Sequence, residues 1–190
     1  MRITGGELRG RRLKTPTTME LRPTQDAVRE AVFSMIANAV PGARFLDLFA
    51  GTGAVGLEAF SRGAASVVWV EKEPRTFKLL QENITAFAGE NLWLKAVCAD
   101  AFAWLGRDPA TAAFDIVYAD PPYDSATSPD RTAEIMCAIA ASGILADGGY
   151  FVAEQRAGTT TPNVPGWELL TDRRYGRTKI MIFKKCTTPT

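Results

Sequence analysis

Short apolar segments alternate with helix-like segments over most of the chain, from residue 43 onwards. The apolar segments cover residues 45–49, 66–71, 92–98, 114–119 and 149–154, and the helical candidates cover residues 55–62, 75–87, 101–105 and 131–141. Connections of this length join parallel strands, because antiparallel neighbours need only a short turn. The sequence therefore predicts an α/β fold with a mainly parallel sheet and helices on both faces.

The two ends of the chain follow other patterns. Residues 167–170 and 179–184 are strand-like and too close together for a helix between them, so we expect an antiparallel hairpin there. Residues 2–13 indicate a second β-hairpin around Gly5-Gly6, since glycine tolerates the positive φ of a tight turn. A helix is then predicted over residues 23–40.

The composition is that of one globular domain, with 190 residues, 46% of them apolar and 23% charged. We expect residues 1–42 to extend a cofactor-binding and catalytic core formed by residues 43–190. No apolar run approaches the ~18 residues that a membrane span needs, and the N-terminus does not resemble a signal peptide. We therefore expect a monomeric cytoplasmic protein with no membrane partner.

Histidine is absent from the sequence, which narrows the possible chemistry. Ser-His-Asp triads, histidine zinc sites and an imidazole general base are all excluded. The three cysteines, Cys98, Cys137 and Cys186, include no C-x-x-C pair, so they suggest neither a disulfide framework nor a zinc site. We expect no metal, and chemistry that depends on carboxylates, backbone groups and a cofactor.

Basic residues concentrate at the two ends, although the net charge is only +1. Residues 1–22 hold 6 Arg and Lys against 2 acidic residues, and residues 173–185 hold 6 against none. Such ends can grip a polyanion, because Lys and Arg that neutralise phosphates supply most of the affinity that is independent of sequence. The alternative is that these are solvated termini with a chance excess of charge.

A glycine-rich segment connects the first predicted strand to the helix that follows it. Residues 51–56 match the G-x-G-x-x-G pattern, and Glu71 lies twenty residues beyond Gly51, where an acidic residue can bind a ribose. Taken alone, this pattern suggests an oxidoreductase that uses a nicotinamide cofactor.

Asp47, four residues before the first glycine, argues for a different ligand. A carboxylate at that position would repel a pyrophosphate but would complement a cation. S-adenosylmethionine carries both an ammonium and a sulfonium group, so it fits an acidic glycine loop better than NAD does. Asp47 can also brace the loop by accepting backbone hydrogen bonds, and the two roles are compatible.

Asp100 follows the third core strand and has two possible roles. Its carboxylate can accept the amino group of an adenine, with the backbone N–H of Ala101 reaching a ring nitrogen. It is also a good N-cap for the short helix predicted after it.

The segment Asp120-Pro121-Pro122-Tyr123 follows the fourth strand, at the edge of the sheet where α/β proteins bind ligands. Two prolines fix the backbone and remove two donors, so Asp120 and the carbonyl of Pro121 can accept both hydrogens of an aromatic amine. Tyr123 offers a ring on which a base can stack, a contact worth ~1–3 kcal/mol. The alternative is an ordinary turn.

These segments together resemble the class I S-adenosylmethionine methyltransferases, and among them the bacterial family that methylates guanine N2 in 16S ribosomal RNA. The resemblance extends over nearly the whole chain. It is carried by residues 3–6, 9–13, 21–24, 28–30, 47–53, 56–59 and 120–123. The N-terminal segments discriminate, because the glycine loop and D-P-P-Y also occur together in DNA adenine-N6 methyltransferases.

The resemblance implies a Rossmann-like sheet of about seven strands and a role for each motif. It places Asp47, Gly51, Gly53, Glu71, Lys72, Asp100, Ala101 and Asp120 around S-adenosylmethionine, and Asp120, Pro121 and Tyr123 at the target base. The expected RNA-binding residues are Arg9, Arg11, Arg12, Arg22, Arg173, Arg174 and Arg177, and the expected partner is 16S ribosomal RNA or a small-subunit particle.

We expect direct transfer of the methyl group to an extruded guanine, with catalysis by positioning and electrostatics. Single-stranded or loop guanines are favoured, since duplex RNA hides its base edges. The alternatives at this point are a DNA adenine-N6 methyltransferase, an NAD-dependent oxidoreductase and a non-catalytic RNA-binding module.

Overall fold

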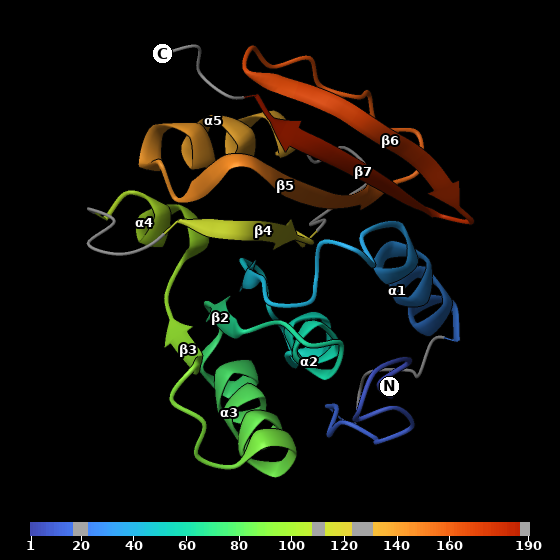
Figure 1. Ribbon diagram of the computed structural model, residues 1–190, viewed down its shortest axis with the longest axis vertical. Coiled ribbons are helices and arrows are strands. Elements are labelled where there is room, and N and C mark those ends of the chain that lie inside the picture. The colour runs from blue at the N-terminus through green and yellow to red at the C-terminus, as the bar shows by residue number, and fades with distance from the viewer. Residues whose placement is uncertain (17–22, 108–112, 123–130, 187–190) are drawn as a thin grey trace.

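A computed structural model describes residues 1–16, 23–107, 113–122 and 131–186 of the chain (Figure 1). The strands are β1 (Arg44–Asp47), β2 (Ser66–Glu71), β3 (Leu94–Cys98), β4 (Phe114–Ala119), β5 (Leu145–Arg156), β6 (Trp167–Tyr175) and β7 (Thr178–Lys185). The helices are α1 (Pro23–Met35), α2 (Ala54–Ser61), α3 (Pro74–Ala88), α4 (Ala101–Leu105) and α5 (Thr132–Ser142).

The described strands form one seven-stranded sheet in the order β3-β2-β1-β4-β5-β7-β6. Strands β1 to β5 are parallel, and β7 is antiparallel to both β5 and β6. The predicted α/β class, the seven strands and the C-terminal antiparallel hairpin are therefore confirmed. The strand order reverses between β1 and β4, which places the switch point of the sheet beside the glycine loop and residue 120.

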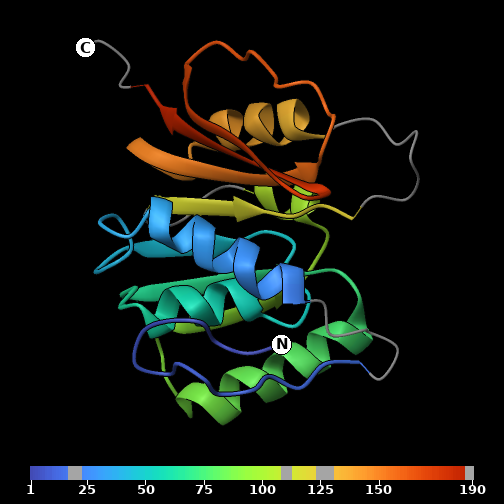
Figure 2. The same cartoon turned by 90° about the vertical axis from the view of Figure 1, so that its right-hand side faces the viewer.

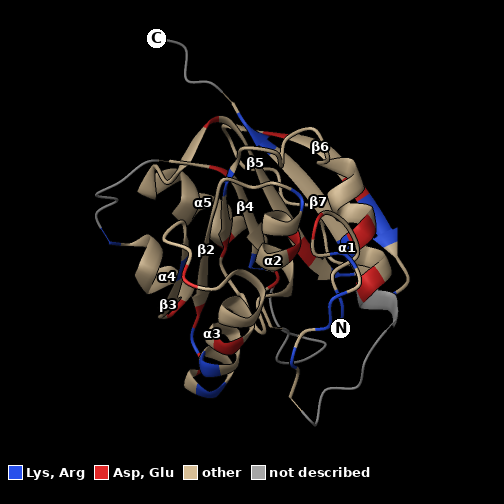
Figure 3. Cartoon of the chain, turned by 60° about the horizontal axis from the view of Figure 1, so that its bottom comes forward, with Lys and Arg blue, Asp and Glu red and all other residues tan. Residues whose placement is uncertain are grey.

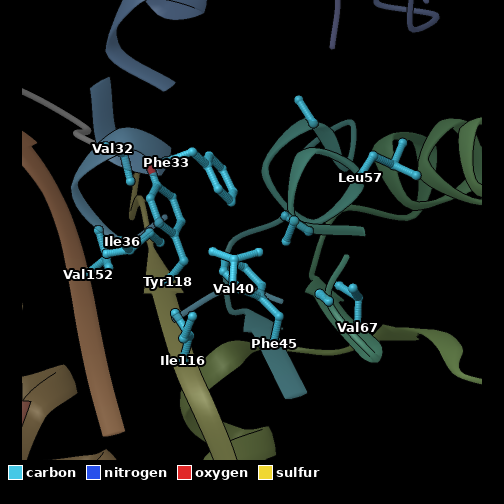
Figure 4. Close-up of a cluster of buried hydrophobic side chains, with 14 of the residues drawn as sticks. Val32, Phe33, Ile36, Val40, Phe45, Leu57, Val67, Ile116, Tyr118 and Val152 are labelled. Carbon is cyan, nitrogen blue, oxygen red and sulfur yellow. The ribbon is translucent and has the colours of Figure 1, made fainter. Parts of the chain in front are cut away.

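Helices cover both faces of the sheet and create two apolar cores (Figure 2). Side chains of α1, α2 and α3 share one core with alternate residues of β1, β2 and β4, including Phe45 and Tyr118. Figure 4 shows Val32 and Phe33 of α1, and Ile36 just after it, in this core with Tyr118 and Val152 of neighbouring strands. Side chains of α4 and α5 lie in the second core, on the opposite face.

Two glycines of the loop occupy positions where a side chain would be strained or would clash. Gly53 has a φ of 85°, a left-handed conformation that glycine adopts without strain. A Cβ atom at Gly56 would lie 2.1 Å from Nε1 of Trp69, a side chain that is fully buried in β2. The third glycine of the pattern therefore allows α2 to approach the sheet closely.

The N-terminal segment differs from the predicted hairpin. Only Arg2 and Arg12 pair as strand residues, and the chain between them forms a series of turns over residues 5–10. Several backbone N–H groups bond to α2 instead of a partner arm: Thr4 donates to Glu58 at 2.8 Å and Glu7 to the Ser61 carbonyl at 2.8 Å. The two arms still meet antiparallel, since the N–H of Ile3 donates to the carbonyl of Arg11 at 3.0 Å and the N–H of Leu13 to that of Met1 at 3.2 Å. The tight turn at Gly5-Gly6 was a wrong prediction, because a longer series of turns that bonds to α2 connects the arms.

Helix α1 begins at Pro23 as predicted but ends at Met35, and turns occupy the residues up to Pro41. Three other elements, β2, β4 and α4, have the predicted limits. Strand β5 begins four residues before the predicted segment and ends two residues after it, and β6 continues to Tyr175. No described helix has the length and apolar character that a membrane crossing requires.

Candidate active site

A cavity of about 890 Å³ opens where the parallel strands end, within the size range of small-molecule sites. Its lining residues come from the segments after β1 to β4, from β5, from α1 and from the turn between β6 and β7: Val28, Leu48, Phe49, Gly51, Val70, Glu71, Lys72, Thr76, Ala99, Asp100, Ala101, Asp120, Pro121, Pro122, Arg131, Glu154, Gly176, Arg177 and Thr178. The cavity thus joins the glycine loop to the segment that begins at Asp120.

Glu71 ends β2 and lines the cavity. Its two carboxylate oxygens accept hydrogen bonds from the backbone N–H groups of Gly51, at 2.8 Å, and Glu73, at 2.7 Å. The carboxylate therefore joins the glycine loop to the start of α3. A ribose diol that binds here would share these acceptor oxygens with the loop.

Asp47 lies beneath the glycine loop and does not line the cavity. Its side chain is 1% exposed and accepts a hydrogen bond from the N–H of Gly56 at 3.2 Å. Burial, partly opposed by the Gly56 hydrogen bond, raises the pKa of Asp47 to about 7, and the charge of Glu71 adds to the rise. The geometry thus shows the loop-bracing role, with a carboxyl group that titrates near neutral pH.

Asp100 caps α4, as one of its two predicted roles requires. Its Oδ1 atom accepts hydrogen bonds from the N–H groups of Phe102, at 3.1 Å, and Ala103, at 3.2 Å. Its Oδ2 atom lies 3.2 Å from Nζ of Lys72. The Ala103 bond and the Lys72 partner hold the pKa of Asp100 below its ordinary value, so the carboxylate at this edge stays ionised.

Asp120 and Pro121 line the cavity beyond the end of β4, whereas Tyr123 lies outside the described residues. Asp120 is exposed to solvent where it lines the cavity. Desolvation, together with the nearby carboxylates of Glu154 and Asp47, raises the pKa of Asp120 above its ordinary value.

Glu154 on β5 also lines the cavity, and the sequence reasoning did not find it. Its Oε2 atom accepts a hydrogen bond from the hydroxyl of Tyr118 at 2.6 Å. Burial raises the pKa of Glu154, while the Tyr118 hydrogen bond opposes the rise. The available signal was its position: Glu154 ends the fifth predicted strand, as Glu71 ends the second.

The predicted RNA-binding arginines fall into different environments. Arg177 lines the cavity, and Arg173 and Arg174 are exposed on β6. Arg9 and Arg12 are exposed at the N-terminus, and Arg22 lies outside the described residues. Figure 3 shows basic segments near the N-terminus and on the strands beside α1.

Arg11 has a structural role in addition to any contact with RNA. Its guanidinium lies 4.4 Å from the ring centroid of Phe87 and donates to the carbonyl of Ala86 at 2.6 Å. These atoms belong to the last turn of α3, where a cation is favourable. Arg11 thus attaches the N-terminal segment to the core.

Known proteins resemble this chain in sequence over almost its whole length. The family model described as Conserved hypothetical protein 95 matches residues 1–184. The chain belongs to that family. It is 32% identical over 186 residues to the Ribosomal RNA small subunit methyltransferase D of Escherichia coli K12, with 97% of this chain and 90% of the relative covered.

Solved structures agree with the family. The candidate methyltransferase yhhF of Escherichia coli matches with a TM-score of 0.85 and 28% identity, over 99% of each chain. The 16S rRNA N2 G1207 methyltransferase RsmC of Thermus thermophilus, in complex with AdoMet and guanosine, shares the fold with a TM-score of 0.69. That match has 24% identity and covers 89% of this chain and 44% of the other.

The comparisons confirm the predicted family, the Rossmann-like fold and the class of methyltransferases that use S-adenosylmethionine. The literal G-x-G-x-x-G pattern is thus not evidence for an oxidoreductase in this chain. The DNA adenine-N6 alternative is not favoured either, because the curated relative is a ribosomal RNA methyltransferase.

Proposed function

We propose that this protein transfers a methyl group from S-adenosylmethionine to the exocyclic N2 amine of a guanine in 16S ribosomal RNA. The observation that carries the proposal is the shared cavity. The acceptor-only Asp120-Pro121 segment and the Gly51 loop line the same space, so an amine and a methyl donor can be held together. The similarity to a small-subunit methyltransferase supports ribosomal RNA as the substrate.

The cofactor half of the cavity fits the donor by its chemistry. Glu71 offers carboxylate oxygens for a ribose, and Asp100 with the N–H of Ala101 offers an acceptor and a donor for an adenine edge. Asp47 supplies negative charge beneath the loop, where a cationic group is favourable. When bound, S-adenosylmethionine supplies a methyl group that is already activated by its sulfonium.

Asp120 and the Pro121 carbonyl accept the two hydrogens of the target amine and direct its lone pair towards the methyl group. With the donor bound, the new carbon–nitrogen bond would form as the sulfur–carbon bond breaks. The electron pair of the broken sulfur–carbon bond would return to sulfur. The nitrogen then gives up one proton. Asp120, whose carboxylate is proposed to accept a hydrogen bond from this amine, can receive the proton when it is ionised.

The RNA backbone is proposed to lie along basic residues outside the cavity. Arg173 and Arg174 are exposed on β6, Arg177 borders the cavity, and Arg9 and Arg12 are exposed at the N-terminus. Tyr123 is proposed to stack on the extruded base, and Arg22 to join the backbone contacts. We further propose that the enzyme acts as a cytoplasmic monomer on naked RNA or on a small-subunit particle.

The decisive experiment is nucleoside mass spectrometry of ribosomal RNA incubated with the protein and labelled S-adenosylmethionine. We expect labelled N2-methylguanosine. Asp120→Ala should abolish transfer while largely sparing cofactor affinity, since Asp120 faces the amine. A fully active Asp120→Ala variant, or label in another nucleoside only, would contradict the proposal.

A further inference from the structure

Glu154 lies beside Asp120 because of the register of the sheet. Strands β4 and β5 pair in parallel through Tyr118 with Val152 and Ala119 with Ala153, so Asp120 and Glu154 are the next residues in line. Adjacent strands are ~4.8 Å apart, and residues two apart on a strand share a face. Both side chains therefore project on the face that α1 covers, where Tyr118 and Val152 lie in Figure 4.

The Glu154 carboxylate is oriented but only partly satisfied. The hydroxyl of Tyr118 donates to Oε2, and no described residue donates a hydrogen bond to Oε1. Arg29, whose charge lowers the pKa of Glu154, is occupied by ion pairs with Glu58, at 3.2 Å, and Asp26, at 3.0 Å. A half-buried carboxylate that lacks a protein donor on one oxygen can accept a hydrogen bond from a ligand in the cavity.

The Watson–Crick edge of guanine presents two donors side by side, the N1–H and the N2 amine. Adenine presents its amine beside N1, which is an acceptor and would face the carboxylate oxygen unfavourably. Two adjacent acceptors, one on Asp120 and one on Glu154, thus match guanine and reject adenine.

We infer that Glu154 is a specificity-determining residue: its Oε1 atom accepts the N1–H of the target guanine, beside the amine that Asp120 holds. The inference rests on the proposed function and names the group that selects the base. Val28 of α1 and Gly176 of the β6–β7 turn line the same cavity as Glu154 and Asp120.

The test replaces the target guanine by 2-aminopurine in a short RNA whose methylated position has first been mapped by mass spectrometry. 2-Aminopurine keeps the N2 amine but has an acceptor at N1. The unmodified protein should methylate it with a kcat/KM about 10- to 100-fold lower than guanine, since one buried acceptor then lacks its donor. Equal methylation of the two bases would overturn the inference without any variant.

Glu154→Gln supplies the second arm, because its amide can donate to N1 of 2-aminopurine. The preference for guanine should fall at least about 10-fold relative to the matched variant Glu168→Gln, an exposed position on β6. An equal loss on both bases would show a merely structural role and overturn the inference. If the unmodified protein methylates no guanine in any RNA, the proposed function fails instead, so the two failures are distinguishable.

Discussion

Binding of S-adenosylmethionine should expel a proton from Asp47. The carboxyl group is 1% exposed and its pKa is raised to about 7, so about half of the molecules carry this proton at pH 7. A cationic ligand above the loop favours the ionised form and returns the pKa towards its ordinary value near 4. Binding should therefore release about 0.5 proton at pH 7, about 0.9 at pH 6 and almost none at pH 8.5.

The same shift makes affinity depend on pH. Protonated Asp47 must ionise before it can attract the ligand, so the dissociation constant should rise as pH falls below 7. With a free pKa of about 7, the loss between pH 7.5 and pH 5.5 is about 25-fold. Isothermal titration calorimetry in buffers of different ionisation enthalpy measures both the proton count and the affinity.

Asp47→Asn is the variant that isolates this group. The amide oxygen can still accept the hydrogen bond from Gly56, but the side chain no longer titrates. Proton release at pH 7 should fall by about 0.5 proton in this variant and stay unchanged in Glu168→Gln, an exposed position on β6. Undiminished release from Asp47→Asn, or none from the unmodified protein at pH 6 to 7, would refute the electrostatic reasoning.

The remaining predictions concern stability and RNA binding. Because folding raises the pKa of Asp47, ionisation of this group destabilises the ligand-free protein increasingly as pH rises from about 4 to about 7. The free energy of unfolding of Asp47→Asn should therefore be up to about 4 kcal/mol higher than that of the unmodified protein at pH 8. Equal urea midpoints for the two proteins would contradict this. Gly56→Ala should reduce the free energy of unfolding by about 1–3 kcal/mol and so lower the melting temperature, since its Cβ would lie 2.1 Å from the Trp69 indole of β2. Gly106→Ala, whose Cβ would lie 3.5 Å from its nearest contact, should leave the melting temperature almost unchanged. Removing the charges of Arg9 and Arg12 should reduce the slope of log affinity against log salt by about 1–2 in RNA-binding titrations, and an unchanged slope would exclude them from the interface.

Local patterns predicted the core of the fold well because each signal acts within a few residues. The limits of β2 and β4 follow from short apolar runs bounded by loops, and the glycine loop follows from its spacing. The arms of the N-terminal hairpin pair as predicted, but its tight turn was wrong because backbone donors between the arms bond to Glu58 and Ser61, which lie more than fifty residues away in the chain. No local pattern shows such partners.

For the same reason, the sequence predicted only some of the residues that line the candidate site. Glu71 was found from its distance to the glycines, and Asp100 from its place directly after the third predicted strand. Glu154 was missed because its meaning depends on its neighbour in the sheet, Asp120, and on the hydroxyl of Tyr118. Parallel register brings these residues together from segments that no sequence motif connects.

The charged side chains of the protein favour different positions for the backbone and for the base of the proposed RNA substrate. The carboxyl groups of Asp47, Asp120 and Glu154 lie close together in and beneath the cavity, where a further negative charge such as a phosphate is unfavourable. Arg173 and Arg174 lie on the exposed edge strand β6, where phosphates can be neutralised in contact with solvent (Figure 3). An RNA strand can satisfy both parts only if its backbone stays outside while one base, with its donors, enters. The proposed extrusion of the base therefore agrees with this arrangement of charges as well as with the reach to the methyl group.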